Sequence, residues 1–445
     1  FDLVDQFHRA DLGCTGDRAA GKDCADQVSR ADAGVIYGIG HDGAVQRGTD
    51  SGATWAITGT APEKLIDVAT SARDPNRIFA ATEGGLFVSA DAGATWQSLL
   101  LTAAPVSTVD MGADGKLRAV QLGRGLIELD EATGAVTLVT AELPDPGPGE
   151  MLLKTHYLGF DPAQKGWMEN IADYVAPMAI GDVMRGSGIC EVIASNGGRY
   201  AVGDMLFGTT GWTEYLVSDG KELTKVETDL SPTAVLSVLG TTGLTAYCGL
   251  FKVGKPVAGD TVLVSGAAGA TGSIVGQLAK IAGCRVVGIA GGQDKCDWLV
   301  REAGYDAAID YKAGRVKEQI REHCPRGVDV IYDNVGGKIL NDMLACIATN
   351  ARVVICGGIS RYETGSLPAG PENYFNLVFR RGTMAGFIVL DWASEFPGIR
   401  KRLEGFVKDG SLKYQEDIQH GFENAPQTLQ RLFTGQNRGK QMLKL

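Results

Sequence analysis

Four small residues, Gly269-Ala270-Thr271-Gly272, lie between a strand-like run and a helix-like run of the sequence. The run before them, 260–266, is apolar and rich in β-branched residues, and the run after them, 273–282, has apolar residues at helical spacing. A second strand-like run, 284–290, completes a strand–turn–helix–strand unit. Small residues let the backbone approach a phosphate, and the first N–H groups of a helix carry partial positive charge. The pattern predicts that Gly269, Ala270, Thr271 and Gly272 hold the pyrophosphate of a dinucleotide; a tight turn without a ligand is the alternative.

The end of the second strand bears on which dinucleotide binds. Units that bind NAD place Asp or Glu there to hold the ribose 2′-hydroxyl. Here the strand ends in Ala290-Gly291-Gly292-Gln293-Asp294-Lys295, so the acidic side chain is replaced by glycine and a lysine follows. Open space and a cation suit a 2′-phosphate, which favours NADPH. The alternative is that Lys295 is a solvated lysine at a helix start, and Asp294 would weaken its attraction for a phosphate.

The histidines do not form a recognisable metal site. None of the five is followed by Glu, no C-x-x-C pair occurs, and His156 has no cluster of soft ligands around it in the sequence. We therefore expect no metal ion. Without zinc there is no Lewis acid to polarise an alcohol, and the hydride chemistry that remains is addition to an activated C=C bond.

Further motifs follow the glycine turn in a fixed order. They are Val287–Lys295, Asp310–Lys312, Asp333–Gly337, Cys356–Tyr362 and Gly435–Lys440. Together they resemble the zinc-independent branch of the medium-chain dehydrogenases/reductases that contains prostaglandin and leukotriene reductases, curcumin reductase and plant alkenal double-bond reductases. The resemblance covers about residues 141–445. It implies a Rossmann NADPH-binding domain with a doubly wound parallel sheet at 240–400, a GroES-like β-rich catalytic domain from 141–239 and 401–445, and a homodimer.

The resemblance also implies roles for individual residues. Lys295 and Tyr311 would contact the 2′-phosphate end of the cofactor, and Asn334 would lie beside it. Tyr362 would hydrogen-bond a developing enolate oxygen or relay a proton. The remaining implied cofactor contacts are Cys356, Gly357, Gly358, Ile359, Phe387, Ile388, Val389 and Asn437. The alternatives are a surface role for Tyr311, a structural role for Asn334 before a Gly-Gly turn, and a pocket wall without a proton role for Tyr362.

These residues predict NADPH-dependent reduction of the C=C bond of α,β-unsaturated ketones or aldehydes, by hydride transfer to the β-carbon and without metal. A zinc-free quinone reductase is one alternative, and a glycan-binding or partner-binding module with a passenger reductase domain is another. Two departures leave the substrate open. Ala163 stands in Asp161–Lys165 where relatives often carry Tyr, and Glu363 follows Tyr362 where Asn is common.

The first part of the chain carries an internal repeat. Residues 47–55 recur as 88–96, and both copies end in Asp-x-Gly-x-Thr-Trp. This resembles the Asp-box repeat of β-propellers, S-x-D-x-G-x-T-W, with Gly48 in place of Ser in the first copy. Asp accepts backbone N–H bonds in a turn and Gly supplies positive φ, so the box is expected to fasten a hairpin rather than to bind or cleave glycans. We therefore predict an all-β, propeller-like segment over 1–140.

The boundary between the two parts is ambiguous in the sequence. Pro and Gly residues over 143–150 precede an apolar strand at 151–154. In the resembling reductases such a segment lies within the catalytic domain, so 116–142 would form its opening hairpin. The same residues also read as a degenerate third blade, which leaves the boundary between 116 and 147.

Composition and charge exclude some classes of protein and partner. Apolar residues make up 44% and charged residues 21%, and no apolar run is long enough to cross a membrane. The net charge of −11 argues against a nucleic-acid partner. Cys14 and Cys24 would suit a disulfide in an oxidising compartment, whereas the other cysteines lie mostly in apolar runs typical of reduced thiols. We therefore expect a cytoplasmic enzyme with a small-molecule partner, although the first segment alone would be compatible with secretion.

Overall fold

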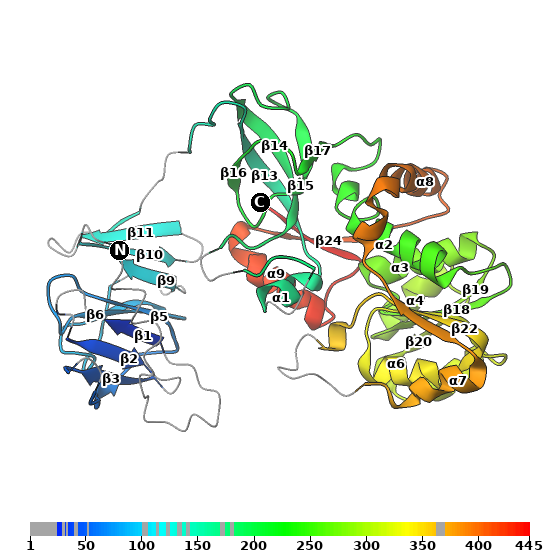
Figure 1. Cartoon of the computed structure of the whole chain (residues 1–445), viewed down its shortest axis with the longest axis horizontal. Coiled ribbons are helices and arrows are strands. Elements are labelled where there is room, and N and C mark those ends of the chain that lie inside the picture. Colours follow the sequence, from blue (N-terminus) through cyan, green and yellow to red (C-terminus); the bar gives the residue numbers. More distant parts are fainter. Residues whose placement is uncertain are drawn as a thin grey trace. The chain divides into compact units, whose positions relative to one another are not determined.

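The computed structural model describes residues 25–28, 32, 34–39, 43–50, 53–99, 106–112, 115–121, 125–130, 136–138, 143–169, 174–178, 182–361 and 370–445. The chain divides into two compact units, Phe1–Glu142 and Leu143–Leu445, coloured blue to cyan and green to red in Figure 1. Within the described ranges, no helix is long and apolar enough to span a bilayer.

In its described residues, the first unit forms three four-stranded antiparallel sheets, each with its strands in chain order. The first sheet is β1 (Ala25–Val28), β2 (Ile36–Ile39), β3 (Ala44–Gly48) and β4 (Ala56–Thr60). The second is β5 (Leu65–Thr70), β6 (Ile78–Thr82), β7 (Gly85–Ser89) and β8 (Gln97–Ser98). The third is β9 (Val106–Met111), β10 (Lys116–Gln121), β11 (Gly125–Asp130) and β12 (Val136–Leu138). Strand β5 lies against both β1 and β9, and apolar clusters fill the spaces between sheets.

The third sheet bears on the ambiguous segment 116–142. Strand β10 pairs with β9 on one side and with β11 on the other, and β11 pairs with β12. These pairings use both edges of β10 and of β11. In the described part of the chain, these strands do not join the catalytic sheet of the second unit.

Both Asp boxes lie in hairpin turns of the first unit. Asp91 accepts hydrogen bonds from the backbone N–H of Thr95 at 2.8 Å, from the Thr95 hydroxyl at 2.6 Å and from the Ser89 hydroxyl at 2.8 Å. These bonds lower the pKa of Asp91 to about 2. Asp50 accepts the equivalent two bonds from Thr54, at 2.8 and 2.7 Å. Each carboxylate is thus bonded within its own turn.

One sheet of the second unit, with six strands in the described residues, is parallel throughout. Its strand order is β20-β19-β18-β21-β22-β23. The strands are β18 (Thr261–Ser265), β19 (Arg285–Ala290), β20 (Ala307–Asp310), β21 (Val328–Asp333), β22 (Ile347–Ile355) and β23 (Thr383–Gly386). This is the Rossmann order, which reverses direction between β18 and β21. One apolar cluster covers each face, so the sheet is doubly wound.

Helices cover both faces of this sheet (Figure 1). They include α2 (Thr241–Cys248), α3 (Ala270–Ile281), α4 (Gln293–Arg301), α5 (Val316–His323), α6 (Gly337–Leu344), α7 (Asn376–Arg380) and α8 (Phe396–Lys408). Residues of α2, α3, α4 and α8 line one apolar cluster, and residues of α5 and α6 line the other. The all-buried pattern of β18 follows from this double cover.

The second sheet of this unit is built from both ends of the unit. It contains β13 (Met151–Gly159), β14 (Ser187–Ser195), β15 (Met205–Thr209), β16 (Tyr215–Ser218), β17 (Leu223–Lys225), β24 (Glu416–His420) and β25 (Lys440–Lys444). Strand β25 lies between β13, to which it is antiparallel, and β24, to which it is parallel. Helices α1 (Ala163–Met168) and α9 (Ala425–Phe433) accompany this sheet. The segments before and after the parallel sheet therefore form one β-rich domain.

Candidate active site

The glycine turn connects β18 to α3 at the carboxyl edge of the parallel sheet. Gly269 is the N-cap of α3, and in the described part of the chain no side-chain cap bonds the first N–H groups of this helix. A Cβ atom on Gly272 would lie 2.3 Å from the carbonyl oxygen of Gly266, so only glycine lets the helix start this close to the turn. Ala270 and Thr271 stand in the first turn of α3. Uncapped N–H groups beside a turn of small residues form a suitable cradle for a phosphate.

The next strand end carries the residues predicted to select the cofactor. A Cβ on Gly291 would lie 2.7 Å from the ring of Tyr311, so this ring packs directly on the glycine. Lys295, in the first turn of α4, donates two hydrogen bonds of 2.8 Å from Nζ, to the carbonyls of Gly435 and Asn437. Burial, followed by the charges of nearby Lys312 and Arg438, lowers the pKa of Lys295. The structure therefore brings Lys295 to Asn437 and Tyr311 to Gly291.

Asn334 is held by a buried polar network that the sequence did not reveal. Its amide Nδ2 donates to the carbonyl of Ser265 at 2.7 Å, and its backbone N–H donates to the Ser265 hydroxyl at 2.9 Å. That hydroxyl in turn donates to the fully buried carboxylate of Asp333 at 2.5 Å. Burial raises the pKa of Asp333, although bonds from Ser265, Val335 and Gly336 oppose the shift. The one available sequence signal was a polar residue at the end of each apolar strand.

The loop after β22 folds over this network. Cys356 and Gly357 donate their backbone N–H groups to the carbonyl of Asp333 at 2.9 and 3.2 Å, and Ile359 donates to the carbonyl of Asn334 at 3.2 Å. Gly358 lies between them in the chain. Burial raises the pKa of Cys356 to about 11, so its thiol is a poor nucleophile at neutral pH. Tyr362, predicted to act on the substrate, lies outside the described residues.

The remaining predicted contacts come from β23 and from the C-terminal segment. Gly386 pairs with Ile355, which sets Phe387, Ile388 and Val389 beside the start of the Cys356 loop. The ring of Phe387 packs 5.9 Å from that of Trp392, centroid to centroid. Asn437 bonds its own segment, from Nδ2 to the Gly439 carbonyl at 2.9 Å, and Gly439 forms an isolated bridge with Gly269. All predicted cofactor contacts other than Asn437 thus follow strand ends at one edge of the sheet.

Ala163 begins α1, in the segment where a tyrosine was expected by resemblance. The neighbouring Gln164 is buried and donates from Nε2 to the carbonyl of Arg185 at 3.1 Å. Asp161 pairs with the buried ammonium of Lys440 at 2.6 Å. These contacts hold α1 against the segment that leads into β14, and the turn before α1 against β25. In the part of the chain that the structure describes, no three His, Cys, Asp or Glu side chains are grouped to hold a metal ion.

Comparisons with known proteins match this region. A family model described as the N-terminal domain of oxidoreductase matches residues 130–226, and one described as zinc-binding dehydrogenase matches 270–404. A putative NADP-dependent oxidoreductase of Bacillus subtilis, YfmJ, is 43% identical over 310 residues, which are 69% of this chain and 91% of that protein. The NADPH-dependent curcumin reductase of Escherichia coli is 38% identical, over 68% of this chain and 90% of its own.

Two further proteins extend the comparison. The NADP-dependent 2-alkenal reductase of Nicotiana tabacum is 37% identical over 68% of this chain and 90% of its own. Among solved structures, CurA of Vibrio vulnificus in complex with NADPH has a TM-score of 0.65 and 38% identity, over 69% of this chain and 94% of that one. These matches cover most of each relative.

Proposed function

Because this chain belongs to the zinc-independent branch of the medium-chain dehydrogenase/reductase family, we propose that it reduces the C=C bond of α,β-unsaturated ketones or aldehydes with NADPH. The observation that carries the proposal is that similar proteins, at 37–38% identity, are named as NADP-dependent reductases of 2-alkenal and of curcumin. A 2-alkenal is by its name an aldehyde conjugated to a C=C bond. The family assignment agrees with the sequence prediction.

The residues at the sheet edge fit NADPH. Gly291 stands where an NAD-binding unit carries an acid, and the Tyr311 ring packs on it, so no acidic side chain at this position repels a 2′-phosphate. Lys295 and Lys312 bring positive charge to the same end. The uncapped start of α3 suits the pyrophosphate.

When bound, NADPH supplies the hydride that the β-carbon of the substrate accepts. The residues of the chain orient the reactants and stabilise the negative charge that develops on the substrate carbonyl oxygen. Phe387, Ile388 and Val389 would flank the nicotinamide. The resemblance implies that Asn437 bonds near the reacting end, but the 2.8 Å hydrogen bond from Lys295 to its carbonyl favours a place at the 2′-phosphate end instead. Tyr362 donates to the enolate oxygen or relays a proton to the product.

An NADPH-consumption screen with the full chain tests this function. We expect oxidation of NADPH with unsaturated ketones and 2-alkenals, and none with the matched saturated ketones, which offer no conjugated C=C bond. Equal rates with saturated and unsaturated ketones would contradict the proposal. Faster turnover of quinones than of any enone would favour the quinone-reductase alternative.

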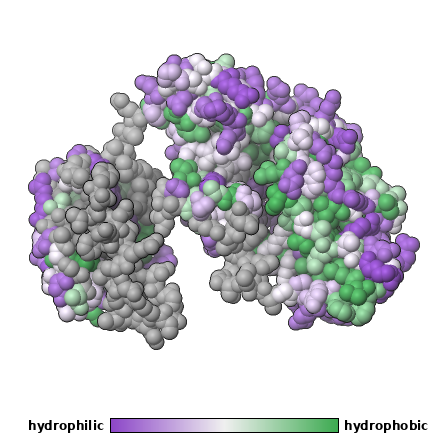
Figure 2. Space-filling view, in the orientation of Figure 1, coloured by the Kyte–Doolittle hydropathy of each residue, from purple (hydrophilic) through white to green (hydrophobic). Residues whose placement is uncertain are grey.

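We also propose a homodimer through the edge of the parallel sheet. Strand β23 is the outermost strand and is exposed along its length. Large apolar side chains are exposed beside it: Tyr374 57%, Phe375 52%, Val378 61%, Phe379 65% and Leu390 59%. Figure 2 shows hydrophobic residues gathered where α7 lies. Light scattering should give twice the chain mass, and Phe379→Asp should give the single mass if this face is the interface.

For the first unit we propose three blades of an Asp-box β-propeller-like array. Three four-stranded meanders, with β5 lying against β1 and β9, support it. The carboxylates of Asp50 and Asp91 are bonded inside their own turns, which supports a structural role for the boxes. The described cysteines are free and mostly buried, which supports a cytoplasmic location.

A further inference from the structure

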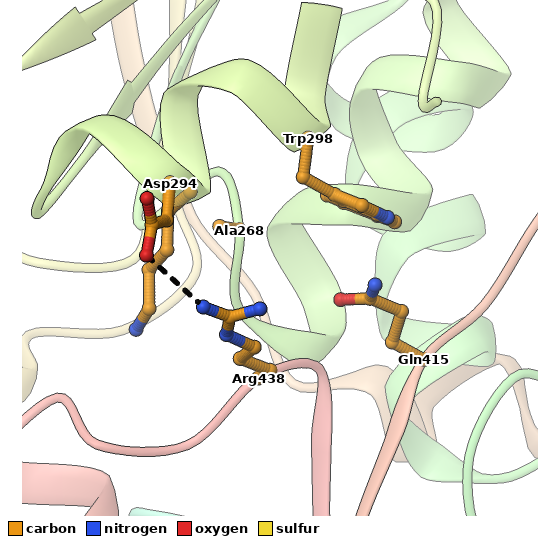
Figure 3. Close-up of a pocket in the computed structure, with 6 residues that line it drawn as sticks. Ala268, Asp294, Trp298, Gln415 and Arg438 are labelled. Atoms are coloured by element: carbon orange, nitrogen blue, oxygen red, sulfur yellow. Dashed lines mark hydrogen bonds and ion pairs between the residues drawn. The ribbon is translucent and has the colours of Figure 1, made fainter. Parts of the chain in front are cut away.

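Arg438 is a cation at the cofactor edge that none of the predicted roles uses. It stands in the segment Gly435–Gly439, next to Gly439, which bridges Gly269 of the glycine turn. Figure 3 shows the guanidinium group reaching from this segment toward Asp294, with Trp298 and Gln415 lying to its other side. Ala268 and Lys295 line the same recess. Arg438 therefore lies between the glycine turn and the first turn of α4.

Lys295 alone is a poor match for a phosphate dianion. Two of its three ammonium N–H groups are already donated to the carbonyls of Gly435 and Asn437, both at 2.8 Å. A phosphate monoester carries close to two negative charges at neutral pH and offers three acceptor oxygens. A site that uses Lys295 therefore has room for a second cationic donor.

The positive charges around Lys295 would also be stabilised by a bound anion. Lys312 and Arg438 are close enough that their charges, after burial, lower the pKa of Lys295. Asp417 opposes this shift, but its carboxylate is paired with Arg431 at 3.0 Å. Three cations from three segments thus converge at the strand end where the acidic residue of NAD-binding units is missing.

Among the residues that the structure describes, the side chain of Arg438 has one weak partner, Asp294. Its Nη2 lies 3.4 Å from Oδ2 of Asp294, and the two side chains are 61% and 86% exposed. An exposed ion pair of this length contributes little stability and is easily exchanged. A guanidinium group presents paired N–H donors that match phosphate oxygens, so a phosphate is a better partner than Asp294.

We propose that Arg438 is a specificity-determining residue that binds the 2′-phosphate of NADPH together with Lys295, and that Asp294 pairs with it in the absence of the phosphate. The inference rests on the proposed placement of the 2′-phosphate beside Lys295. It adds a contact from the C-terminal segment, so the catalytic domain takes part in recognising the cofactor.

Calorimetry on the full chain tests the inference with NADPH, NADH, 2′,5′-ADP and 5′-AMP. We expect Arg438→Gln to weaken binding of NADPH and 2′,5′-ADP by about tenfold or more, since a hydrogen bond between charged groups is lost. Binding of NADH and 5′-AMP should stay within about twofold of the wild-type protein. Arg438→Lys should recover part of the loss, and Asp294→Asn should tighten NADPH binding by about two- to threefold.

Arg301→Gln is the matched control, because Arg301 is an exposed arginine in the last turn of α4, the helix that carries Asp294 and Lys295. It should leave all four affinities unchanged, and equal melting temperatures should show that each variant is folded. Equal losses for NADPH and NADH in Arg438→Gln, or no loss, would overturn the inference while leaving the proposed function intact. If the wild-type protein binds NADPH no better than NADH, the NADPH assignment fails with it.

Discussion

Ser265 and Asp333 end two neighbouring parallel strands, β18 and β21, and share a hydrogen bond of 2.5 Å in the interior. The same serine accepts the backbone N–H of Asn334 on its hydroxyl and the amide N–H on its carbonyl. Asn334 therefore owes its orientation to a serine from a different strand. We therefore infer that Ser265 and Asp333 are positioning residues, which would act on the cofactor through Asn334.

Replacing Ser265 by alanine removes a donor from a buried carboxylate and an acceptor from Asn334. We expect the free energy of unfolding to fall by about 1–3 kcal/mol, the usual effect of leaving a buried polar group unsatisfied. NADPH binding should weaken as well, which urea denaturation and calorimetry would measure. Ser187→Ala, at an exposed serine of β14, is the control and should change stability by less than about 0.5 kcal/mol. If Ser265→Ala kept the wild-type free energy of unfolding and the wild-type affinity for NADPH, Ser265 would not have the proposed role in positioning Asn334.

Tyr362 is predicted to act on the substrate rather than on the cofactor. Tyr362→Phe should lower kcat for an enone by about 10²-fold if the hydroxyl stabilises the negative charge on the enolate oxygen or relays a proton. The dissociation constant for NADPH should stay unchanged, because the phenyl ring and the cofactor contacts remain. A variant with full kcat but a raised KM would instead support a role as a pocket wall.

The hairpin turn of the second Asp box shows how a short element is held by its own side chains. Hydrogen bonds from Thr95 and Ser89 lower the pKa of Asp91 to about 2 from an ordinary value of 3.8. Because the folded state favours the charged form, the carboxylate contributes stability above the ordinary pKa. That contribution is lost as the pH falls from about 3.8 toward about 2.

Thr95→Val removes the hydroxyl bond to Asp91 while keeping the size of the side chain. The pKa of Asp91 should then rise from about 2 toward 3.8, as measured by an NMR titration of the carboxyl carbon. Asp50, bonded to Thr54 in the other box, serves as an internal control and should keep its own lowered pKa. A pKa of Asp91 unchanged by the substitution would show that Thr95 does not set it.

Some elements could be predicted from the sequence and others could not. The strand, turn and helix within 260–290 could be predicted, because a turn of small residues and a helical pattern lie between two apolar strands at the expected spacing. The network of Asp333 could not be foreseen, since it depends on two strands that are distant in the chain and adjacent in the sheet. The assignment of 116–138 stayed open for a similar reason. Its alternating apolar residues suit a hairpin in either unit, and only strand pairing decides.

At the scale of the whole molecule, two compact units imply two separate unfolding events. Differential scanning calorimetry should show two transitions. NADPH at about 100 times its dissociation constant should stabilise one unit by about 2.7 kcal/mol and raise the temperature of that transition alone. NADH at the same concentration is the control, with a smaller shift expected. A single transition, or equal shifts of both, would show that the units unfold together.

The place of β25 in the catalytic sheet has a consequence for how the protein is made. This strand joins β13 to β24, yet the ribosome produces it only after the whole parallel sheet has been synthesised. The first unit and the parallel sheet can fold as they emerge, because their strands are contiguous in the chain. The β-rich domain cannot complete its sheet until then, because the edge of β13 that pairs with β25 stays unpaired. A message truncated before Lys440 therefore yields a folded first unit and an open edge prone to aggregation, rather than a weaker enzyme.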